Sequence, residues 1–308
     1  MLSWLAMGSM SVVAFICGAI AVLGLPTVAQ DVPYALSAWS CGVIVWPNEL
    51  PDYADNFAQQ LSEAAEAAFG FWGYPLPATA EEPHDEASAI RIYNPTTETE
   101  MVISPLTWND RVIQPVVVFA FPDEAAMRSA LGETRLFGAM WCPLPIGQAF
   151  PHTDPWIAEA GNDRRNLLCP SWASDSALIH ECAHWFTYEW CSARRIDPYR
   201  IPDYIVEGIA EATSSVVEDH NTAVYDHLRA LAWAKDNCLP VADMGSVMMY
   251  AVGESLVNYL VDTVGIDSFL STLSRWAMEP WNMIDLVETG WRISLVLAGD
   301  CPFDTVRN

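Results

Sequence analysis

The residues best suited to chemistry lie between Ser174 and Trp190, in a stretch that contains the pattern His-Glu-Cys-Ala-His. In a helix of about 100° per residue, His180 and His184 lie roughly 40° apart on one face, with Glu181 beside them. Two neutral imidazole nitrogens one turn apart, next to a carboxylate that is not itself a ligand, are what a catalytic zinc ion requires. The stretch therefore predicts a zinc site, unless two core histidines share this spacing by chance.

The local sequence favours a helix at this position. Ser174 or Asp175 can cap its start, no glycine or proline interrupts it, and apolar residues can line its buried side. Cys182 projects roughly 200° away from His180 around such a helix. We therefore expect Cys182 to be a core residue and not a fourth ligand.

A second pair of carboxylates follows on a helix expected over residues 202–217, where Pro202 suits the first turn. Glu207 and Glu211 are one turn apart, so both can face the histidines. One of them can ligate zinc, while the other can accept a hydrogen bond from the far nitrogen of a ligating histidine. The alternative is an ordinary acidic helix face exposed to solvent.

These motifs resemble the gluzincin metallopeptidases, in particular the compact peptidase-MA-like domains. The first motif is followed, 23 positions after His184, by the glutamate of Asp-Tyr-Ile-Val-Glu-Gly-Ile-Ala-Glu. The resemblance covers approximately residues 110–290, and it is specific in the two zinc motifs and loose elsewhere. It implies one Zn²⁺ ion. The residue roles that it implies are zinc ligation by His180, His184 and Glu207, general base catalysis by Glu181, and support of a ligating histidine by Glu211.

The resemblance also extends to Met249–Leu260, which is similar to the helix that follows in this family. There, a tyrosine three residues before a glycine donates a hydrogen bond to the oxyanion, which implies that role for Tyr250. The alternative is a tyrosine that belongs to the core of an apolar helix. Val206 departs from the family, because many members place asparagine before the ligand glutamate.

Residues 136–141 (Leu-Phe-Gly-Ala-Met-Trp) resemble the edge strand that binds substrate in zinc aminopeptidases of this clan. In those enzymes a glutamate follows Gly-Ala-Met and holds the amino terminus of the substrate, but here Trp141 and Cys142 stand in its place. We expect an extended peptide to pair with this strand through backbone hydrogen bonds. Aminopeptidase activity is not supported.

The elements expected around these motifs predict an α+β fold. Short strands are expected over 89–93, 101–104, 112–121, 135–144 and 166–169, and helices over 52–69 and 122–131. From Ser174 on, all expected elements are helices: 174–190, 202–217, 221–236, 246–264 and 266–277. This order predicts a small mixed β-sheet in the amino-terminal half, packed on an all-helical carboxyl-terminal half, with the zincin-like active-site helix at the junction.

The domain organisation follows from these elements. Residues 30–172 are expected to form an α/β subdomain that carries the substrate-edge strand, and residues 173–308 a helical zinc-binding catalytic subdomain. Residues 1–29 read as a signal peptide or an amino-terminal membrane anchor, because residues 2–29 carry no charged side chain. The protein is therefore expected to be exported, either released or attached to a membrane through residues 2–25.

The composition excludes one class of partner. The chain of 308 residues is 52% hydrophobic and has a formal net charge of −25. Such acidity repels nucleic acid, which is not expected as a partner, and it also repels anionic lipid. Seven cysteines follow the first 29 residues, and an exported chain could form up to three disulfides from them.

The predicted activity is hydrolysis of a peptide or protein substrate. Zinc held by two imidazoles and one carboxylate keeps an open position and lowers the pKa of a bound water to around 7. Glu181 can then take the proton from the water and pass it to the leaving amine. Two alternatives remain open: an exported protein with this fold that serves in binding or assembly without catalysis, and a zinc hydrolase of a non-peptide bond.

Overall fold

The structure is a computed structural model that describes residues 34–47, 49–80, 89–94, 98–134, 138–161, 165–215, 230 and 246–298. The amino-terminal segment 1–29 lies outside these residues, as does the helix expected over 221–236 apart from Ala230. Among the described helices, none is both long and apolar enough to cross a lipid bilayer.

A five-stranded mixed sheet organises the amino-terminal half. Its strand order is β1-β2-β8-β10-β9, with β1 at Tyr34–Trp39, β2 at Gly42–Pro47, β8 at Val116–Phe121, β10 at Arg165–Pro170 and β9 at Met140–Cys142. The three central strands are parallel, while β1 and β9 run antiparallel to their neighbours. Two strands, β1 and β2, were not expected from the sequence, although Val43–Trp46 is as apolar as β8.

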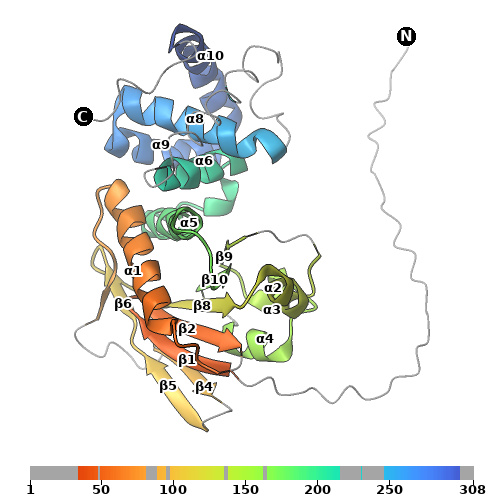
Figure 1. Cartoon of the computed structure of the whole chain (residues 1–308). Helices are drawn as coiled ribbons and strands as arrows, with labels where there is room; N and C mark the ends of the chain where they lie inside the picture. Colours follow the sequence, from red (N-terminus) through yellow and green to blue (C-terminus); the bar gives the residue numbers. More distant parts are fainter. Residues whose placement is uncertain are drawn as a thin grey trace, which may run out of the picture. The chain divides into compact units, whose positions relative to one another are not determined.

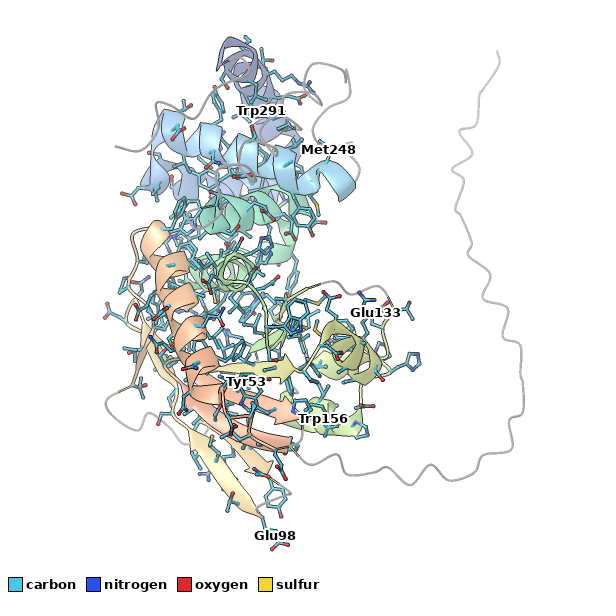
Figure 2. All side chains as sticks on the ribbon, viewed as in Figure 1. Tyr53, Glu98, Glu133, Trp156, Met248 and Trp291 are labelled. Atoms are coloured by element: carbon cyan, nitrogen blue, oxygen red, sulfur yellow. The ribbon has the colours of Figure 1, made fainter. Side chains whose placement is uncertain are left out.

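Alternating side chains of the central strands fill two separate apolar layers. Ile44, Val118 and Leu167 point to the layer that contains α1 (Ala54–Phe71) and α5 (Asp175–Ala193). Val45, Phe119 and Leu168 point to the opposite layer. That layer is closed by α2 (Glu124–Leu131), α3 (Ile146–Ala149) and α4 (Pro155–Gly161), on which Trp156 is labelled in Figure 2. Both faces of the sheet are therefore covered, as expected for parallel strands.

Two smaller sheets surround this frame. One joins β3 (Ala78–Thr79), β6 (Leu106–Trp108) and β7 (Arg111–Ile113), and the other pairs β4 (Ile90–Asn94) with β5 (Thr99–Ile103). The strand expected over 112–121 is divided in the structure, because the chain leaves β7 at Ile113 and enters β8 at Val116. Pro115 lies in the break, where it cannot donate to a strand ladder.

The carboxyl-terminal half is helical wherever it is described. After α5 come a short 3₁₀ turn, η2 (Pro198–Arg200), and α6 (Asp203–Ser214), and then α8 (Ser246–Val264), α9 (Ile266–Met278) and α10 (Pro280–Ala298). The sequence analysis missed α10. Ser174 caps α5 by accepting a hydrogen bond of 3.2 Å from the amide of Ala177. The α+β class, with strands first and helices after, is confirmed.

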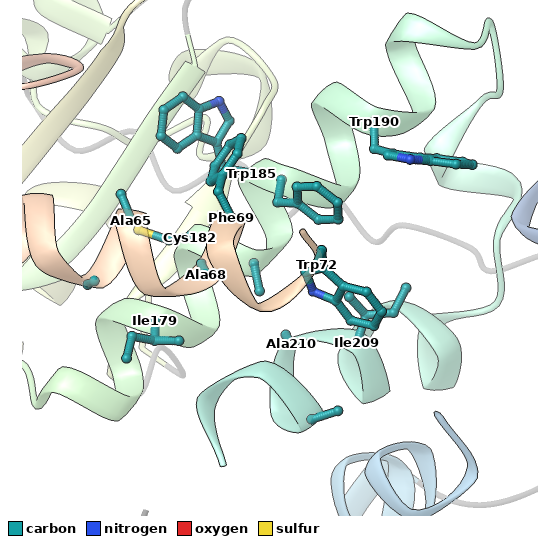
Figure 3. Close-up of a cluster of buried hydrophobic side chains, with 14 of the residues drawn as sticks. Ala65, Ala68, Phe69, Trp72, Ile179, Cys182, Trp185, Trp190, Ile209 and Ala210 are labelled. Carbon is teal, nitrogen blue, oxygen red and sulfur yellow. The ribbon is translucent and has the colours of Figure 1, made fainter. Parts of the chain in front are cut away.

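Helix α5 lies between the two halves of the fold and contacts α1 on one side and α6 on the other (Figure 1). Figure 3 shows this packing, with Cys182 and Ile179 of α5 near Ala65 and Ala68 of α1. The indole of Trp72, at the end of α1, donates a hydrogen bond of 2.9 Å to the hydroxyl of Thr213 on α6. The buried core therefore continues from the sheet layer into the helical half.

Two glycines bring α6 and α8 into backbone contact. A Cβ atom added to Gly208 would lie 2.4 Å from the carbonyl oxygen of Gly253, and one added to Gly253 would lie 2.3 Å from the carbonyl oxygen of Tyr204. No side chain fits between the helices at this crossing. Since Glu207 precedes Gly208 and Tyr250 lies one turn before Gly253, the close approach also brings these two residues to the same region.

Candidate metal centre

Three donor atoms from two helices converge on one point. The Nε2 atoms of His180 and His184 are 3.1 Å apart, and Oε2 of Glu207 lies 3.3 Å from the first and 3.4 Å from the second. In a tetrahedral zinc site with bonds of about 2.0–2.1 Å, neighbouring ligand atoms are about 3.3 Å apart. The three donors therefore already have the spacing that a tetrahedral zinc ion imposes.

The second carboxylate of α6 approaches the other nitrogen of the first histidine. Oε1 of Glu211 lies 3.2 Å from Nδ1 of His180. A proton on Nδ1 shared with Glu211 leaves Nε2 as the nitrogen that offers its lone pair to the common point. The sequence left open which glutamate ligates zinc and which supports a histidine. Glu207 has the position of the ligand, and Glu211 has the position of the support.

The electrostatics of the centre favour a cation. Burial by itself lowers the pKa of His180, but the carboxylates of Glu207, Glu211 and Glu181 outweigh it and raise that pKa to about 10. Burial raises the pKa of Glu207, and the two histidines then bring it down to about 2. Three carboxylates thus surround two imidazoles, and their negative charge favours the protonated form of His180. A divalent ion at the same place would neutralise this negative charge instead.

Solvent reaches the donor atoms from one side only. The side chains of His180, His184 and Glu207 are 14%, 12% and 21% exposed, while the other faces of α5 are packed against the core. Donors that are mostly buried but still reachable by solvent suit an ion that must also meet a substrate.

Glu181 lies beside the centre and is held by the edge strand. The backbone amide of Trp141 on β9 donates a hydrogen bond of 2.6 Å to Oε2 of Glu181, which is a buried side chain. Glu181 is not among the three residues whose donor atoms group together, and these are the only such group found in the described chain. Its place next to the ligands, but outside the donor set, suits a proton acceptor.

Tyr250 reaches the centre from α8. Its ring centre lies 6.2 Å from that of His180, with the ring planes at 42°, and its side chain is half exposed. Burial, followed by the charges of Glu207, Glu181 and Glu211, raises the pKa of Tyr250 to about 12. The hydroxyl therefore keeps its proton at neutral pH and remains a hydrogen-bond donor.

The cysteines in the described part of the chain take no part in the centre. Cys182 is buried in the core on the far side of α5, as expected, and burial raises its pKa. It is one of five described cysteines that are buried free thiols; the others are Cys41, Cys142, Cys169 and Cys191. The disulfides that the cysteine count permits therefore do not form among the described residues.

Two features of the centre were not found from the sequence. Residues 136–141 suggested a substrate strand, but the hydrogen bond from the Trp141 amide to Glu181 depends on how β9 lies against α5. The contact of Gly208 with Gly253 was also missed. Its signal was a glycine in each of two apolar helices, which often marks a close crossing, although one sequence does not say which helices cross.

Comparisons with protein-family models, with curated proteins and with solved structures found no match to this chain.

Proposed function

We propose that this chain is a zinc-dependent peptidase with a zincin-like catalytic domain. The observation that carries the proposal is the triangle of Nε2 of His180, Nε2 of His184 and Oε2 of Glu207, with sides of 3.1, 3.3 and 3.4 Å. Imidazole and carboxylate donors at this spacing fit a tetrahedral Zn²⁺ ion with one position left for water or substrate. When bound, zinc supplies a positive charge that polarises a carbonyl group and acidifies water.

The residues around the triangle supply the other catalytic functions: proton transfer, orientation of a ligand and stabilisation of the oxyanion. Glu181 accepts the proton of the attacking water and delivers it to the leaving amine, while the Trp141 amide keeps its carboxylate in place. Glu211 orients the imidazole of His180. Tyr250, which stays protonated, donates a hydrogen bond to the oxyanion as it develops. The substrate is an extended peptide outside the cytoplasm, aligned along the β9 edge of the sheet.

The test is metal analysis of the purified protein together with digestion of a mixed-sequence peptide library. We expect one zinc ion per chain, loss of that zinc in His184→Ala, and its retention in His152→Ala, a matched control in an exposed loop. Glu181→Gln should keep zinc but reduce hydrolysis by at least about 10²-fold.

Three results would overturn the proposal. They are iron in place of zinc, no metal at stoichiometric level, or a fully active Glu181→Gln protein. One equivalent of zinc without cleavage of any peptide would instead point to a role in binding or assembly.

A further inference from the structure

The partly exposed face of α5 that carries His180 and His184 extends one turn further along the helix. His180, His184 and Tyr188 are four residues apart, so they follow one another along the same face. All three are partly exposed, while the residues between them are buried. Tyr188 therefore lies next to the candidate metal centre, although the proposed hydrolysis assigns it no part.

The edge strand brings a second aromatic ring to this position. The indole of Trp141 lies 6.5 Å from the ring of Tyr188 at 61°, an edge-to-face arrangement, and 6.3 Å from the buried Trp185. The backbone amide of the same Trp141 touches the carboxylate of Glu181. A group that lies against the Trp141 and Tyr188 rings is therefore close to the proposed reacting atoms.

A third ring comes from the turn that follows α5. Tyr199, in η2, is 60% exposed. The turn η2 contacts α5. Burial of part of the ring, and then Tyr188 and Cys142, raise the pKa of Tyr199 to about 12. Its backbone is fixed, because its amide donates a hydrogen bond of 3.1 Å to the side chain of Asp197. A large aromatic ring is thus exposed at the surface next to α5.

The positive charge next to Tyr188 is already paired. The guanidinium of Arg165 lies 5.2 Å from the ring centre of Tyr188, and it forms an ion pair with Glu189, whose side chain is fully buried. Arg165 therefore stabilises the ring from behind and offers no unbalanced positive charge to an acidic ligand. The net charge of −25 on the whole chain disfavours acidic ligands, and the rings can contact an apolar side chain.

From this arrangement we infer that Trp141, Tyr188 and Tyr199 form an aromatic wall that binds an aromatic or large aliphatic side chain of the peptide, next to the cleaved bond. This inference rests on the proposed peptidase function and specifies the class of substrate. Ring-to-ring contact and burial of apolar area supply the preference, and a small side chain such as alanine gains little from either.

The first experiment measures the preference for a large side chain from the rates of peptide hydrolysis. The zinc-loaded protein is given two fluorogenic peptides that differ only in phenylalanine or alanine at the position that a library digest identifies. We expect Tyr199→Ser to lower kcat/KM for the phenylalanine peptide about tenfold more than for the alanine peptide. Tyr93→Ser, which alters a similarly exposed tyrosine on β4, should change neither value. An equal loss of kcat/KM for both peptides would contradict the proposed binding of the side chain by the aromatic wall.

The second experiment needs no turnover. The Glu181→Gln protein is titrated with two fluorescein-labelled peptides that differ only in phenylalanine or alanine at their central position, and binding is followed by fluorescence anisotropy. Tighter binding of the phenylalanine peptide that is weakened by Tyr199→Ser supports the aromatic wall. This holds even if the unsubstituted protein cleaves nothing, because the absence of cleavage would contradict only the proposed peptidase activity. Equal affinities, or no binding of either peptide, would overturn the wall even if hydrolysis is observed.

Discussion

Nε2 of His180 lies 3.1 Å from Nε2 of His184 and 3.3 Å from Oε2 of Glu207. Because nearby carboxylates raise the pKa of His180 to about 10, this imidazole carries a proton on Nε2 at neutral pH. A metal ion at this point must displace that proton, because a histidine nitrogen ligates only in its neutral form.

Zinc binding should release protons at neutral pH. Because nearby carboxylates raise the pKa of His180 to about 10, this residue is charged at pH 7.5 before the metal arrives. We expect release of about one proton for each zinc bound. Calorimetric titration in buffers of different ionisation enthalpy measures this number. A heat of binding that does not depend on the buffer would contradict the predicted protonation of His180.

The metal-free protein should be most stable in mildly acidic solution. Glu207 has its pKa lowered from 4.5 to about 2, so its contribution is complete above pH 4.5 and is lost as the pH falls through 2. His180 has its pKa raised from 6.5 to about 10, so its contribution is complete below pH 6.5 and is lost as the pH rises through 10. The melting temperature in chelator should therefore peak between about pH 4.5 and 6.5.

Zinc should reverse this trend on the alkaline side. Because His180 must be neutral to bind the ion, the gain in melting temperature from added zinc should grow between about pH 6 and 9. Thermal unfolding with zinc and with chelator across this range measures both curves. In His180→Gln we expect the decline of the metal-free protein between about pH 6.5 and 8.5 to be absent, and a persistent decline in this range would assign it to another group.

Tyr250→Phe should lower kcat while zinc stays bound. Loss of one hydrogen-bond donor to an oxyanion costs about 10²–10³-fold in kcat, with a smaller effect on KM. Steady-state kinetics and metal analysis of the same sample separate the two effects. Tyr259→Phe, which removes a hydroxyl from the same helix α8, is the matched control and should retain kcat. An unchanged kcat in Tyr250→Phe would restrict this tyrosine to packing.

Gly253→Ala should weaken the contact between α6 and α8. The added methyl group would lie 2.3 Å from the carbonyl oxygen of Tyr204, so the helices must separate, and we expect a loss of about 1–3 kcal/mol in the free energy of unfolding. Gly70→Ala is the control, because this glycine of α1 has no atom within 4 Å of the added methyl. It should stabilise the protein by about 0.5–1 kcal/mol. Denaturant unfolding of the two variants compares these signs.

Thr213→Val should destabilise the protein by removing the acceptor for a buried indole. The Nε1 atom of Trp72 donates to the Thr213 hydroxyl at 2.9 Å, and valine would leave this donor unpaired at a cost of about 1–3 kcal/mol. Thr213→Ser keeps the oxygen and should lose less. Chemical unfolding of both variants measures the difference, and a larger loss in Thr213→Ser than in Thr213→Val would mean that the methyl group of threonine matters more than its hydroxyl.

The local geometry of the site could be predicted from the sequence because it depends on helical spacing. His180 and His184 are one turn apart in any regular helix, and so are Glu207 and Glu211. Ser174, one of the two caps expected for α5, caps this helix, and the helix expected over 122–131 ends before Gly132, which has a φ of 63°. These features follow from a few neighbouring residues.

Features that depend on distant partners could not be obtained in this way. The β1–β2 hairpin lies in a stretch rich in proline and tryptophan, and only its pairing with β8 makes it part of the central sheet. The hydrogen bond between Trp141 and Glu181 joins residues that are 40 positions apart. No pattern within either segment specifies the distance between them, because it is set by the packing of α5 against the sheet.

The burial of α5 restricts how this protein can be altered. Eleven of its residues lie in the interior, and the partly exposed line of His180, His184 and Tyr188 is its main access to solvent. Random substitutions in this helix will mostly yield unfolded chains, whatever substrate is selected for. New specificities are therefore better sought at exposed positions outside α5, such as Tyr199 of η2.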